Sequence, residues 1–412
     1  MNLIFIILSN INNIKQRGIY PDLMRKFRDE GHHVYIVSSA ERRMGMKTQV
    51  LDVDGVKILK VRMLNVQKTS VAEKGLGQLL MESQYKQAIK KHRGDVKFDL
   101  ILYSTPPITF TKVVRFLKRR NAKAMSYLLL KDIFLQNAVD LGMFFEGSLL
   151  NWYFRRKEIA LYKVSDFIGC MSPANVGFLL KHNAFIDKCR VEVAPNSISL
   201  NVNALSDDDE GKNKRLAERI YIRNKYGLPT DKLIFIYGGN LGKPQGIDYP
   251  IKCLDANKER KDCFFVVVGN GTEYHKLASW MSGVRCLTEN VCVKLMERLP
   301  KEDYDMLARS CDVGLIFLDH RFTIPNYPSR LLPYLENRMP VICCTDPNTD
   351  IGRIAEENGY GFWCESVKPE DFTALVDRML QSDRETMGER GYEFLKQNYT
   401  VEHTYNTIMK HL

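Results

Sequence analysis

The sequence predicts an α/β protein made of two doubly wound domains that face each other across a cleft. The chain has 412 residues, which is more than one hydrophobic core usually supports, so two domains are expected. Short apolar runs alternate with helical patterns in both halves, as in parallel sheets that helices cover on both faces. A polar stretch, LSDDDEGKNKR at 205–215, separates the two series.

The first series starts with an apolar strand at 3–9. A helix is expected over 19–30, where apolar residues recur at helical spacing and Gly31 ends the pattern. The next strand covers 33–39. Later strands are predicted in the segments VKILKVRM, DLILYS, AKAMSYLLL, DFIGCMS and RVEVAPNSI.

The second series predicts strands in the segments KLIFIYGGN, CFFVVVGNG, VCVKLME, DVGLIFL, MPVICCT and GFWCE. Together the two series predict an N-terminal domain at 1–200, an exposed connection at 201–230 and a C-terminal domain at 231–395. The tail has two amphipathic stretches broken near Asn398. Its final helix, at about 396–412, packs either on the second domain or back on the first.

Composition excludes several classes of protein. The first apolar run ends at Leu8, with no basic segment before it and no small-residue cleavage site after it. It therefore predicts a buried strand and a cytoplasmic protein rather than a signal peptide. The run is also far shorter than the roughly 20 residues that span a bilayer. The ten cysteines have no regular spacing, which favours buried thiols over disulfides or a metal site.

The net charge is unevenly distributed along the chain. Residues 1–198 carry +15 and residues 199–412 carry −4, which gives the total of +11. A basic half is typical of proteins that meet nucleic acid, anionic lipid or a phosphorylated acceptor. No nucleic-acid-binding signature accompanies the charge, so no such partner is expected. A solvated basic surface without any partner is the alternative interpretation.

The strongest functional pattern is a glycine-rich loop that follows a strand. The apolar run IFIY leads into Gly239, Asn240, Gln245 and Gly246, and then into a helix. Glycines let the backbone approach a ligand closely, and the N–H groups at a helix start favour a diphosphate. Lys243 in the same loop would add a direct cation. A tight turn without a ligand is the alternative.

Two further turns follow in the second half. Gly269 and Gly271 begin a Gly-x-Gly pattern after a strand, but no third glycine completes a dinucleotide signature. In the segment 321–342, a proline-rich loop leads to Ser329, which is expected to cap a helix with Arg330 in its first turn. Both turns would lie at the carboxyl edge of the sheet, where open α/β sheets bind ligands.

The order and spacing of these segments resemble glycosyltransferase family 4, most strongly over 230–345. That family has the GT-B fold, in which two Rossmann-like domains face each other across a cleft. The resemblance implies that the loop around Gly239 contacts the diphosphate of a nucleotide-sugar donor. It also implies that the segment starting at Leu299 lies near the nucleotide base and that the segment 321–342 faces the sugar and ribose.

Two departures from the family pattern concern donor contacts. The family usually has an arginine and a lysine in the glycine loop, where this chain has Asn240 and Gln245. Two prolines also stand where the family has two glutamates. Asn326 is the candidate to replace the first glutamate near the sugar. Glu336, about one turn beyond the second, is the candidate to bind the ribose.

The first domain offers an acceptor side. The resemblance places Gly18, in the turn after the first strand, near the donor phosphates and the acceptor. Lys131 and Asp132 follow a later strand, and a carboxylate there could orient or deprotonate an acceptor hydroxyl. Capping of the following helix by Asp132 is the alternative.

The segment 143–163 combines aromatic and basic side chains. Phe144, Phe145, Trp152 and their apolar neighbours stand beside Arg155, Arg156 and Lys157. This mixture is typical of a segment that lies among anionic lipid headgroups at the inner face of the plasma membrane. An amphipathic helix with its aromatic face in the domain core is the alternative.

These observations predict a hexosyltransferase that moves a sugar from a nucleotide-sugar to a glycan or polyprenyl-linked glycan. The resemblance implies retention of anomeric configuration, no metal, no cofactor beyond the nucleotide-sugar co-substrate, and a role in capsular or surface polysaccharide synthesis. Asp132 and Lys243 are the candidate catalytic residues. Two other functions stay open: an inactive binding or partner subunit of the same fold, and a sugar-nucleotide epimerase.

Overall fold

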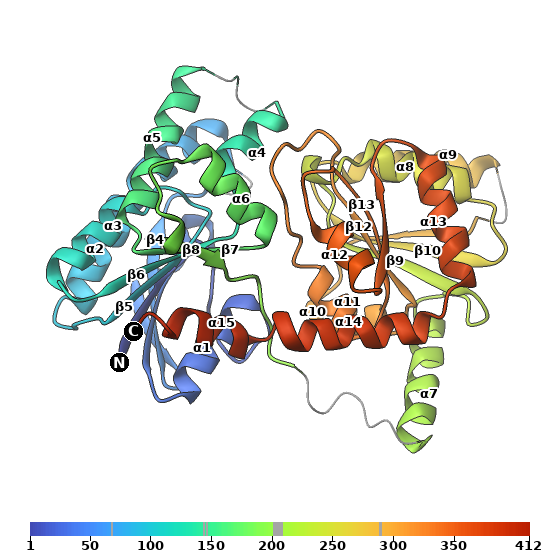
Figure 1. Ribbon diagram of the computed structural model, residues 1–412, viewed down its shortest axis with the longest axis horizontal. Helices are drawn as coiled ribbons and strands as arrows, with labels where there is room; N and C mark the ends of the chain where they lie inside the picture. The colour runs from blue at the N-terminus through green and yellow to red at the C-terminus, as the bar shows by residue number, and fades with distance from the viewer. Residues whose placement is uncertain (67–68, 143–144, 146, 201–208, 288–290) are drawn as a thin grey trace. The chain divides into compact units, whose positions relative to one another are not determined.

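The computed structural model describes residues 1–66, 69–142, 145, 147–200, 209–287 and 291–412. The chain divides into two compact units (Figure 1). Unit 1 consists of Met1–Ser199 with Tyr399–Leu412, and unit 2 of Leu200–Asn398. In the described part of the chain, no helix is both long and apolar enough to cross a membrane.

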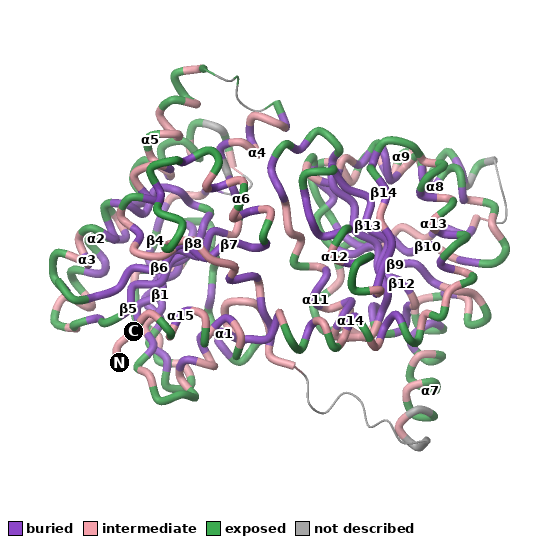
Figure 2. Tube along the Cα trace, in the orientation of Figure 1, coloured by how far each residue is buried: buried purple, intermediate pink, exposed green. Residues whose placement is uncertain are grey.

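Unit 1 contains an eight-stranded sheet in the order β3-β4-β2-β1-β5-β6-β7-β8. Its strands are β1 (Asn2–Ile6), β2 (His33–Glu41), β3 (Gln49–Val53), β4 (Val56–Met63), β5 (Leu100–Ser104), β6 (Met125–Leu130), β7 (Phe167–Cys170) and β8 (Val191–Val193). The central strands β1, β5 and β6 are almost entirely buried, as Figure 2 shows. Burial on both faces explains why these strands read as continuous apolar runs.

The β3–β4 pair is an antiparallel hairpin that the sequence pattern did not predict. Its turn consists of Asp54 and Gly55, whose φ angles of 55° and 77° match the type I′ turn that Asp-Gly favours. The expectation of a wholly parallel first sheet is therefore wrong at this edge. β3 has no fully buried residue, so it lacks the apolar run by which the other strands were found.

Helices cover both faces of this sheet (Figure 1). They are α1 (Ile19–Asp29), α2 (Val71–Arg93), α3 (Thr111–Arg120), α4 (Phe134–Asp140), α5 (Leu149–Val164), α6 (Pro173–His182) and α15 (Val401–Met409), with short 3₁₀ turns at Arg42–Met44 and Lys188–Arg190. α15 packs on α1, where the rings of Phe27 and Tyr405 are 4.9 Å apart between centroids. Unit 1 is therefore built from both ends of the sequence.

The two places where the chain leaves and re-enters unit 1 are joined by backbone hydrogen bonds. Ile198 N–H donates to the Tyr399 carbonyl at 3.0 Å, and Val401 N–H donates to the Ile198 carbonyl at 3.2 Å. Thr400 then caps α15, with its side chain accepting from His403 N–H. The helical break thus falls beside Asn398, where the sequence predicts it.

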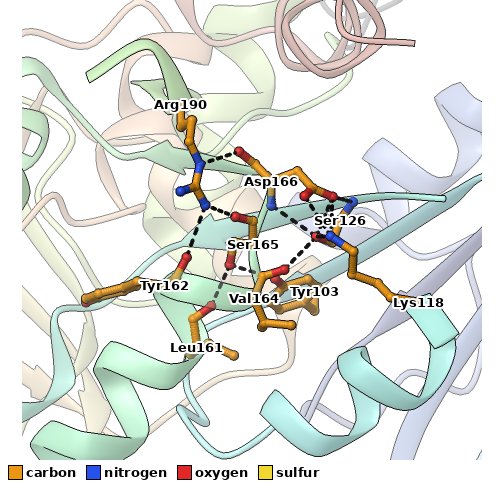
Figure 3. A network of polar contacts seen from close by, with 9 residues as sticks. All are labelled: Tyr103, Lys118, Ser126, Leu161, Tyr162, Val164, Ser165, Asp166 and Arg190. Atoms are coloured by element: carbon orange, nitrogen blue, oxygen red, sulfur yellow. Dashed lines mark hydrogen bonds and ion pairs between the residues drawn. The ribbon is translucent and has the colours of Figure 1, made fainter. Parts of the chain in front are cut away.

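A polar network fixes the amino ends of β6 and β7 (Figure 3). The Asp166 carboxylate accepts from Lys118 Nζ at 2.6 Å and 2.7 Å, and from Ser126 N–H at 2.8 Å. Tyr103 and Ser165 share a hydrogen bond of 2.7 Å between their hydroxyls. Arg190 donates to the Asp166 carbonyl at 3.0 Å. The network ties α3 and the end of α5 to three strands.

Unit 2 contains a six-stranded parallel sheet in the order β11-β10-β9-β12-β13-β14. Its strands are β9 (Leu233–Asn240), β10 (Cys263–Asn270), β11 (Val293–Met296), β12 (Val313–Phe317), β13 (Val341–Thr345) and β14 (Gly361–Glu365). Numbered within the unit, this order is 3-2-1-4-5-6, which is the Rossmann order. The strand order reverses between β9 and β12, and such a switch point is where these sheets bind ligands.

The prediction of two Rossmann-like doubly wound domains is confirmed, whereas the cleft between them stays a prediction. The helices of unit 2 are α7 (Asp209–Lys225), α8 (Asp248–Asn257), α9 (Tyr274–Leu287), α10 (Lys301–Arg309), α11 (Leu331–Glu336), α12 (Ile351–Glu357), α13 (Pro369–Gln381) and α14 (Arg384–Asn398).

α7 occupies much of the stretch that the sequence predicted to be an exposed connection. Residues 201–208 of that stretch lie outside the described residues. The Arg223 side chain of α7 is buried and pairs with Asp312 at 2.7 Å. It also donates to the carbonyl of Ser310 at 2.8 Å. These contacts fix α7 to unit 2, so the predicted connection is not exposed at Arg223.

Candidate functional site

The predicted glycine loop lies at the switch point of unit 2, where β9 ends. Gly239 has a φ angle of 140°, which side-chain-bearing residues rarely adopt. A Cβ built on Gly239 would be 3.4 Å from Nη2 of Arg330. The fold therefore brings the glycine loop and Arg330 together, although they are far apart in the sequence.

Arg330 is the cation nearest to this backbone. Its guanidinium carbon lies 4.3 Å from the centre of the Tyr237 ring, a stacked arrangement that arginine favours. Its Nη1 atom is buried and has no hydrogen-bond partner among the described residues. Nδ2 of Asn326 is likewise buried without an acceptor in the described part of the chain. Two buried donors without acceptors are consistent with a site for an anion.

Two tyrosines that the sequence pattern did not single out complete the floor of the site. A Cβ on Gly238 would be 1.9 Å from the Tyr304 hydroxyl, so only glycine fits there. The Tyr334 hydroxyl accepts from Gly238 N–H at 3.2 Å and donates to the Ile236 carbonyl at 3.1 Å. α10 and α11 thus each supply one hydroxyl to the end of β9.

The middle of the loop is held by its own side chains. Gln245 Oε1 accepts from Asn240 Nδ2 and from Gly242 N–H, both at 3.1 Å. Gly246 ends the short 3₁₀ turn Lys243–Gln245 with a φ angle of 58°. Lys243 is exposed. Asn240 and Gln245, which replace the usual basic pair, therefore shape the loop by bonding to each other.

Gly269 and Gly271 face the neighbouring loop. A Cβ on Gly269 would be 1.9 Å from the Gly239 carbonyl oxygen, and a Cβ on Gly271 would be 2.2 Å from that of Leu241. Both glycines thus allow two backbones to pack directly on each other. They position the glycine loop, whatever further contact they make with a ligand.

The predicted cap by Ser329 is wrong. α11 begins at Leu331 with Arg330 at its N-cap position, and no side chain caps it. The first N–H groups of the helix instead donate to backbone carbonyls, Leu331 to Pro328 at 3.3 Å and Leu332 to Ser329 at 3.2 Å. A tight backbone turn therefore provides the acceptors at the start of α11 that the serine hydroxyl was expected to provide.

The two remaining donor candidates of unit 2 have different positions. Leu299 is partly buried in the loop before α10, the helix that carries Tyr304. Glu336 is the last residue of α11 and lies two positions beyond Tyr334. Two helical positions correspond to a rotation of about 200°, so Glu336 leaves the helix on the side away from β9. The contact of Glu336 with the ribose stays a prediction.

Asp346, just after β13, organises the adjoining loop. Its carboxylate accepts from Asn348 N–H at 2.8 Å and from Thr349 N–H at 2.9 Å. Thr349 in turn donates its hydroxyl to the Asn326 carbonyl. Burial raises the pKa of Asp346 to about 6, and the two backbone donors oppose that shift. The Asp346 contacts thereby hold Asn326 in place.

In unit 1, Gly18 starts α1 after the loop that follows β1. Its N–H donates to Asp22 Oδ1 at 2.9 Å. A Cβ there would meet only Pro21, at an ordinary 3.6 Å, so packing within unit 1 does not require glycine. The loop before it is fixed by the buried Lys60, which donates to the Ile11 carbonyl at 3.1 Å and to Ser38 Oγ at 3.0 Å.

Lys131 and Asp132 follow β6, as predicted. α4 has Ile133 at its N-cap position and no side-chain cap, so the alternative role of Asp132 as a cap is wrong. The Asp132 carboxyl reaches solvent, yet the surrounding protein desolvates it and raises its pKa to about 6, against the charge of Lys131. Desolvation lowers the pKa of Lys131 to about 7. Lys131 Nζ donates to the Ala194 carbonyl at 3.0 Å.

The signals for the missed residues are weak in the sequence. Tyr304 lies within a helix that the family resemblance placed only near the base, and Tyr334 reads as an ordinary helical core residue. Among the described residues, no group of three histidine, cysteine or carboxylate side chains could hold a metal ion.

The fold corresponds to that of a known class of enzymes. Two Rossmann-like domains in one chain define the GT-B architecture of glycosyltransferases. Residues 218–394 match the family model described as glycosyl transferases group 1. The chain is thus a transferase, and its match to group 1 glycosyl transferases lies within unit 2.

Relatives support this class. The chain is 23% identical over 338 residues to the probable glycosyltransferase WbjE of Pseudomonas aeruginosa, covering 81% of this chain and 78% of WbjE. It is 25% identical over 164 residues to the putative colanic acid biosynthesis glycosyl transferase WcaI of Escherichia coli K12, covering 39% of this chain and 38% of WcaI. The Anabaena protein HepE in complex with UDP-glucose has the same fold, with a TM-score of 0.69 at 14% identity, covering 100% of this chain and 98% of HepE.

Proposed function

We propose that the protein transfers a hexose, with retention of configuration, from a nucleotide-sugar to a growing glycan in surface polysaccharide synthesis. The observation that carries this proposal is Arg330, which lies beside the backbone of Gly239 and whose buried Nη1 lacks an acceptor among the described residues, as does the buried Nδ2 of Asn326. A diphosphate supplies the acceptor oxygens that these donors lack. The similarity to WcaI, which is described as acting in colanic acid biosynthesis, supports a polysaccharide product.

The chemistry divides between the two units. In the transfer, the bond between C1 of the sugar and the phosphate oxygen breaks, and C1 bonds to an acceptor oxygen on the same face. Arg330 stabilises the departing nucleoside diphosphate, and Lys243 adds a second positive charge. Asp132 takes the acceptor proton, and its pKa of about 6 suits a base that works near neutral pH. No metal and no further cofactor take part in this proposal.

A panel of nucleotide-sugars tests the proposal. UDP-, GDP-, ADP- and TDP-glucose are each added to the protein, and its melting temperature is recorded. A ligand that binds the native state raises that temperature, so we expect a rise with one nucleotide and little with the others. The binding nucleotide-sugar is then incubated alone and followed by NMR.

The outcomes separate the three candidate functions. Stabilisation together with slow release of free sugar, or transfer to an added glycan, supports a transferase. Conversion of the bound sugar to its epimer without any acceptor identifies an epimerase, and stabilisation without turnover identifies an inactive binding subunit. No stabilisation by any of the four compounds contradicts the donor site.

We further propose that unit 1 contacts an anionic membrane through the segment 143–163. Phe145 and Leu149 are 85% and 88% exposed, and Trp152 is 56% exposed. The Arg156 guanidinium lies 4.6 Å from the centre of the Trp152 ring. Phe144, part of the same prediction, lies outside the described residues. Exposed apolar side chains beside cations fit the boundary between headgroups and acyl chains.

Vesicle binding tests the membrane contact. The change Leu149→Ser with Trp152→Ser removes two exposed apolar side chains, each contributing about 1.5–3 kcal/mol when buried. We expect at least tenfold weaker co-sedimentation with phosphatidylcholine vesicles that contain phosphatidylglycerol. Val367→Ser in unit 2, where the side chain is 48% exposed, is the matched control and should bind normally. Equal binding by all three proteins would rule out this segment as the contact.

A further inference from the structure

Unit 1 contains a cavity to which the proposed transfer reaction assigns no role. It has a volume of about 140 Å³ and is lined by residues of α4, α5 and α6. A cavity of roughly 150 Å³ holds one benzene molecule, so this space is suited to a single six-membered ring. Its wall begins at Ile133, directly after the candidate base Asp132.

A buried carboxylate lines this cavity with one oxygen unsatisfied. Glu158 is 3% exposed, and its Oε1 atom has no hydrogen-bond partner in the described part of the chain. Its other oxygen, Oε2, accepts from Arg155. Leaving a buried carboxylate oxygen without a donor is energetically unfavourable. Burial raises the pKa of Glu158, and Arg155 opposes the shift.

Arg155 directs its second terminal nitrogen away from Glu158 Oε1. Its Nη2 donates to the His182 carbonyl at 2.9 Å and to Asn183 Oδ1 at 2.8 Å. Arg155 therefore bridges α5 to the end of α6 and fixes the orientation of Glu158. The Tyr162 hydroxyl also interacts with the Glu158 carboxylate and lowers its pKa, so a ligand would supply a further donor, to Oε1.

Two other polar residues of the wall, His182 and Gln136, each present an acceptor atom. His182 Nδ1 lies 2.9 Å from the Phe178 carbonyl, which places the proton on Nδ1 and leaves Nε2 as an acceptor. Gln136 donates its amide to Asp140 at 2.8 Å, which leaves its oxygen available. The His182 ring stacks on Phe178 with 4.0 Å between centroids. The wall thus combines hydrogen-bond acceptors with an aromatic face.

We propose that this pocket binds one sugar residue of the acceptor glycan, with a ring hydroxyl donating to Glu158 Oε1. A sugar ring matches the wall because it has several hydroxyl donors at its rim and apolar C–H groups on its faces. The ligand class is a neutral pyranose, since the lining carboxylate already pairs with Arg155. That the bound sugar belongs to an acceptor rests on the proposed transferase function. The binding of a sugar in this pocket does not depend on that function.

The pocket is also rigid enough to select a ligand. The end of α5 is held by the network of Figure 3, in which Arg190 donates to the carbonyls of Ser165 and of Tyr162, the latter at 3.4 Å. Tyr162 lies one turn beyond Glu158 and also lines the cavity. Groups fixed in advance in this way bind a ligand with less loss of conformational entropy.

Saturation-transfer NMR tests the pocket directly. The probes are the methyl glycosides of glucose, galactose, mannose, fucose and N-acetylglucosamine, each added to the full-length protein. We expect saturation transfer to at least one of them. Glu158→Gln keeps the shape but presents a donor where the ligand needs an acceptor, so it should weaken binding at least tenfold. Gln136→Phe should abolish binding by filling the cavity.

Glu82→Gln is the matched control. Glu82 is another buried glutamate of unit 1, 5% exposed, but it pairs with Lys112 and Lys157 outside the cavity lining. This variant should bind the glycoside normally. Melting curves of all three variants confirm that they are folded. The proposal would be overturned if no glycoside showed saturation transfer in the NMR experiment. Equal saturation transfer with the wild type and with Glu158→Gln would also overturn it.

The nucleotide-sugar panel distinguishes a failure of the proposed transferase function from a failure of the sugar-pocket inference. If a glycoside binds and depends on Glu158 but no nucleotide-sugar stabilises the protein, the pocket stands and the proposed transferase function fails. If a nucleotide-sugar binds and no glycoside does, the donor site stands and the pocket inference fails. If both the donor site and the sugar pocket bind their ligands, Glu158→Gln should raise the KM for the acceptor and leave the KM for the donor unchanged.

Discussion

Replacing Arg330 by alanine is expected to reduce kcat/KM for the nucleotide-sugar by about 10²–10³, which corresponds to roughly 3–4 kcal/mol. The guanidinium is the cation closest to the backbone of Gly239, and its Nη1 atom is buried without a partner among the described residues. In the proposed reaction, its loss removes the positive charge that stabilises the departing nucleoside diphosphate. Steady-state kinetics and calorimetric titration with the bare nucleoside diphosphate measure the effect.

Two further variants show whether the effect of Arg330→Ala is specific to the position and shape of this side chain. Arg330→Lys keeps the charge but loses the planar stacking on Tyr237, so it should recover only part of the activity. Arg353→Ala removes an exposed arginine that pairs with Glu357 on the surface of α12, and it should change neither affinity nor rate. If Arg330→Ala bound the nucleotide as tightly as Arg353→Ala, the diphosphate would have to sit elsewhere.

Gly269→Ala is expected to destabilise unit 2 by about 3 kcal/mol, the upper end of the usual range for overpacking a core. The added Cβ would be 1.9 Å from the Gly239 carbonyl oxygen, and a backbone atom in the middle of a sheet cannot move aside cheaply. A loss of this size lowers the melting temperature by roughly 6–12 °C in a domain of this length. Nucleotide binding should weaken in parallel, because Gly239 itself would be displaced.

The same substitution at Gly283 is the matched control. Gly283 is an exposed residue within α9, and a Cβ added there would have nothing within 4 Å of it among the described residues. Alanine there should raise stability by about 0.5–1 kcal/mol, because glycine weakens a helix interior. The two variants therefore differ in the sign of their effect. Equal effects would mean that the close packing between β9 and β10 does not limit stability.

Much of the fold could be predicted because buried parallel strands have a distinctive sequence pattern. The strands of both sheets are continuous apolar runs, and helical periodicity fills the intervals between them. β3 was not predicted because it is an edge strand whose residues are exposed or only partly buried. Its Asp54-Gly55 turn was nevertheless readable as a hairpin signal. The attachment of α7 to unit 2 was not predicted, because its buried residues are only Ile222 and Arg223 among those described, and Arg223 looks like a surface residue in a charged stretch.

The site was predictable only in part, for a different reason. Glycines mark a close approach of backbones, so the loop at Gly239 could be identified from the sequence. What fills the space opposite a glycine is decided by the tertiary fold, and the sequence did not indicate that Tyr304 would face Gly238. Ser329 was assigned a cap because serine favours that position, yet the backbone turn at Pro328 already satisfied the helix.

The joining of Ile198 to Tyr399 and Val401 has a consequence for how the protein is made. During synthesis, the strands of unit 1 leave the ribosome first, but Phe27 stays uncovered until α15 has been translated and can bring in Tyr405 and Ile408. The whole of unit 2 is made in the meantime and can fold as a domain of its own. The unit that starts the chain is thus the one that matures later, and a nascent chain stalled before residue 401 exposes an apolar face to chaperones.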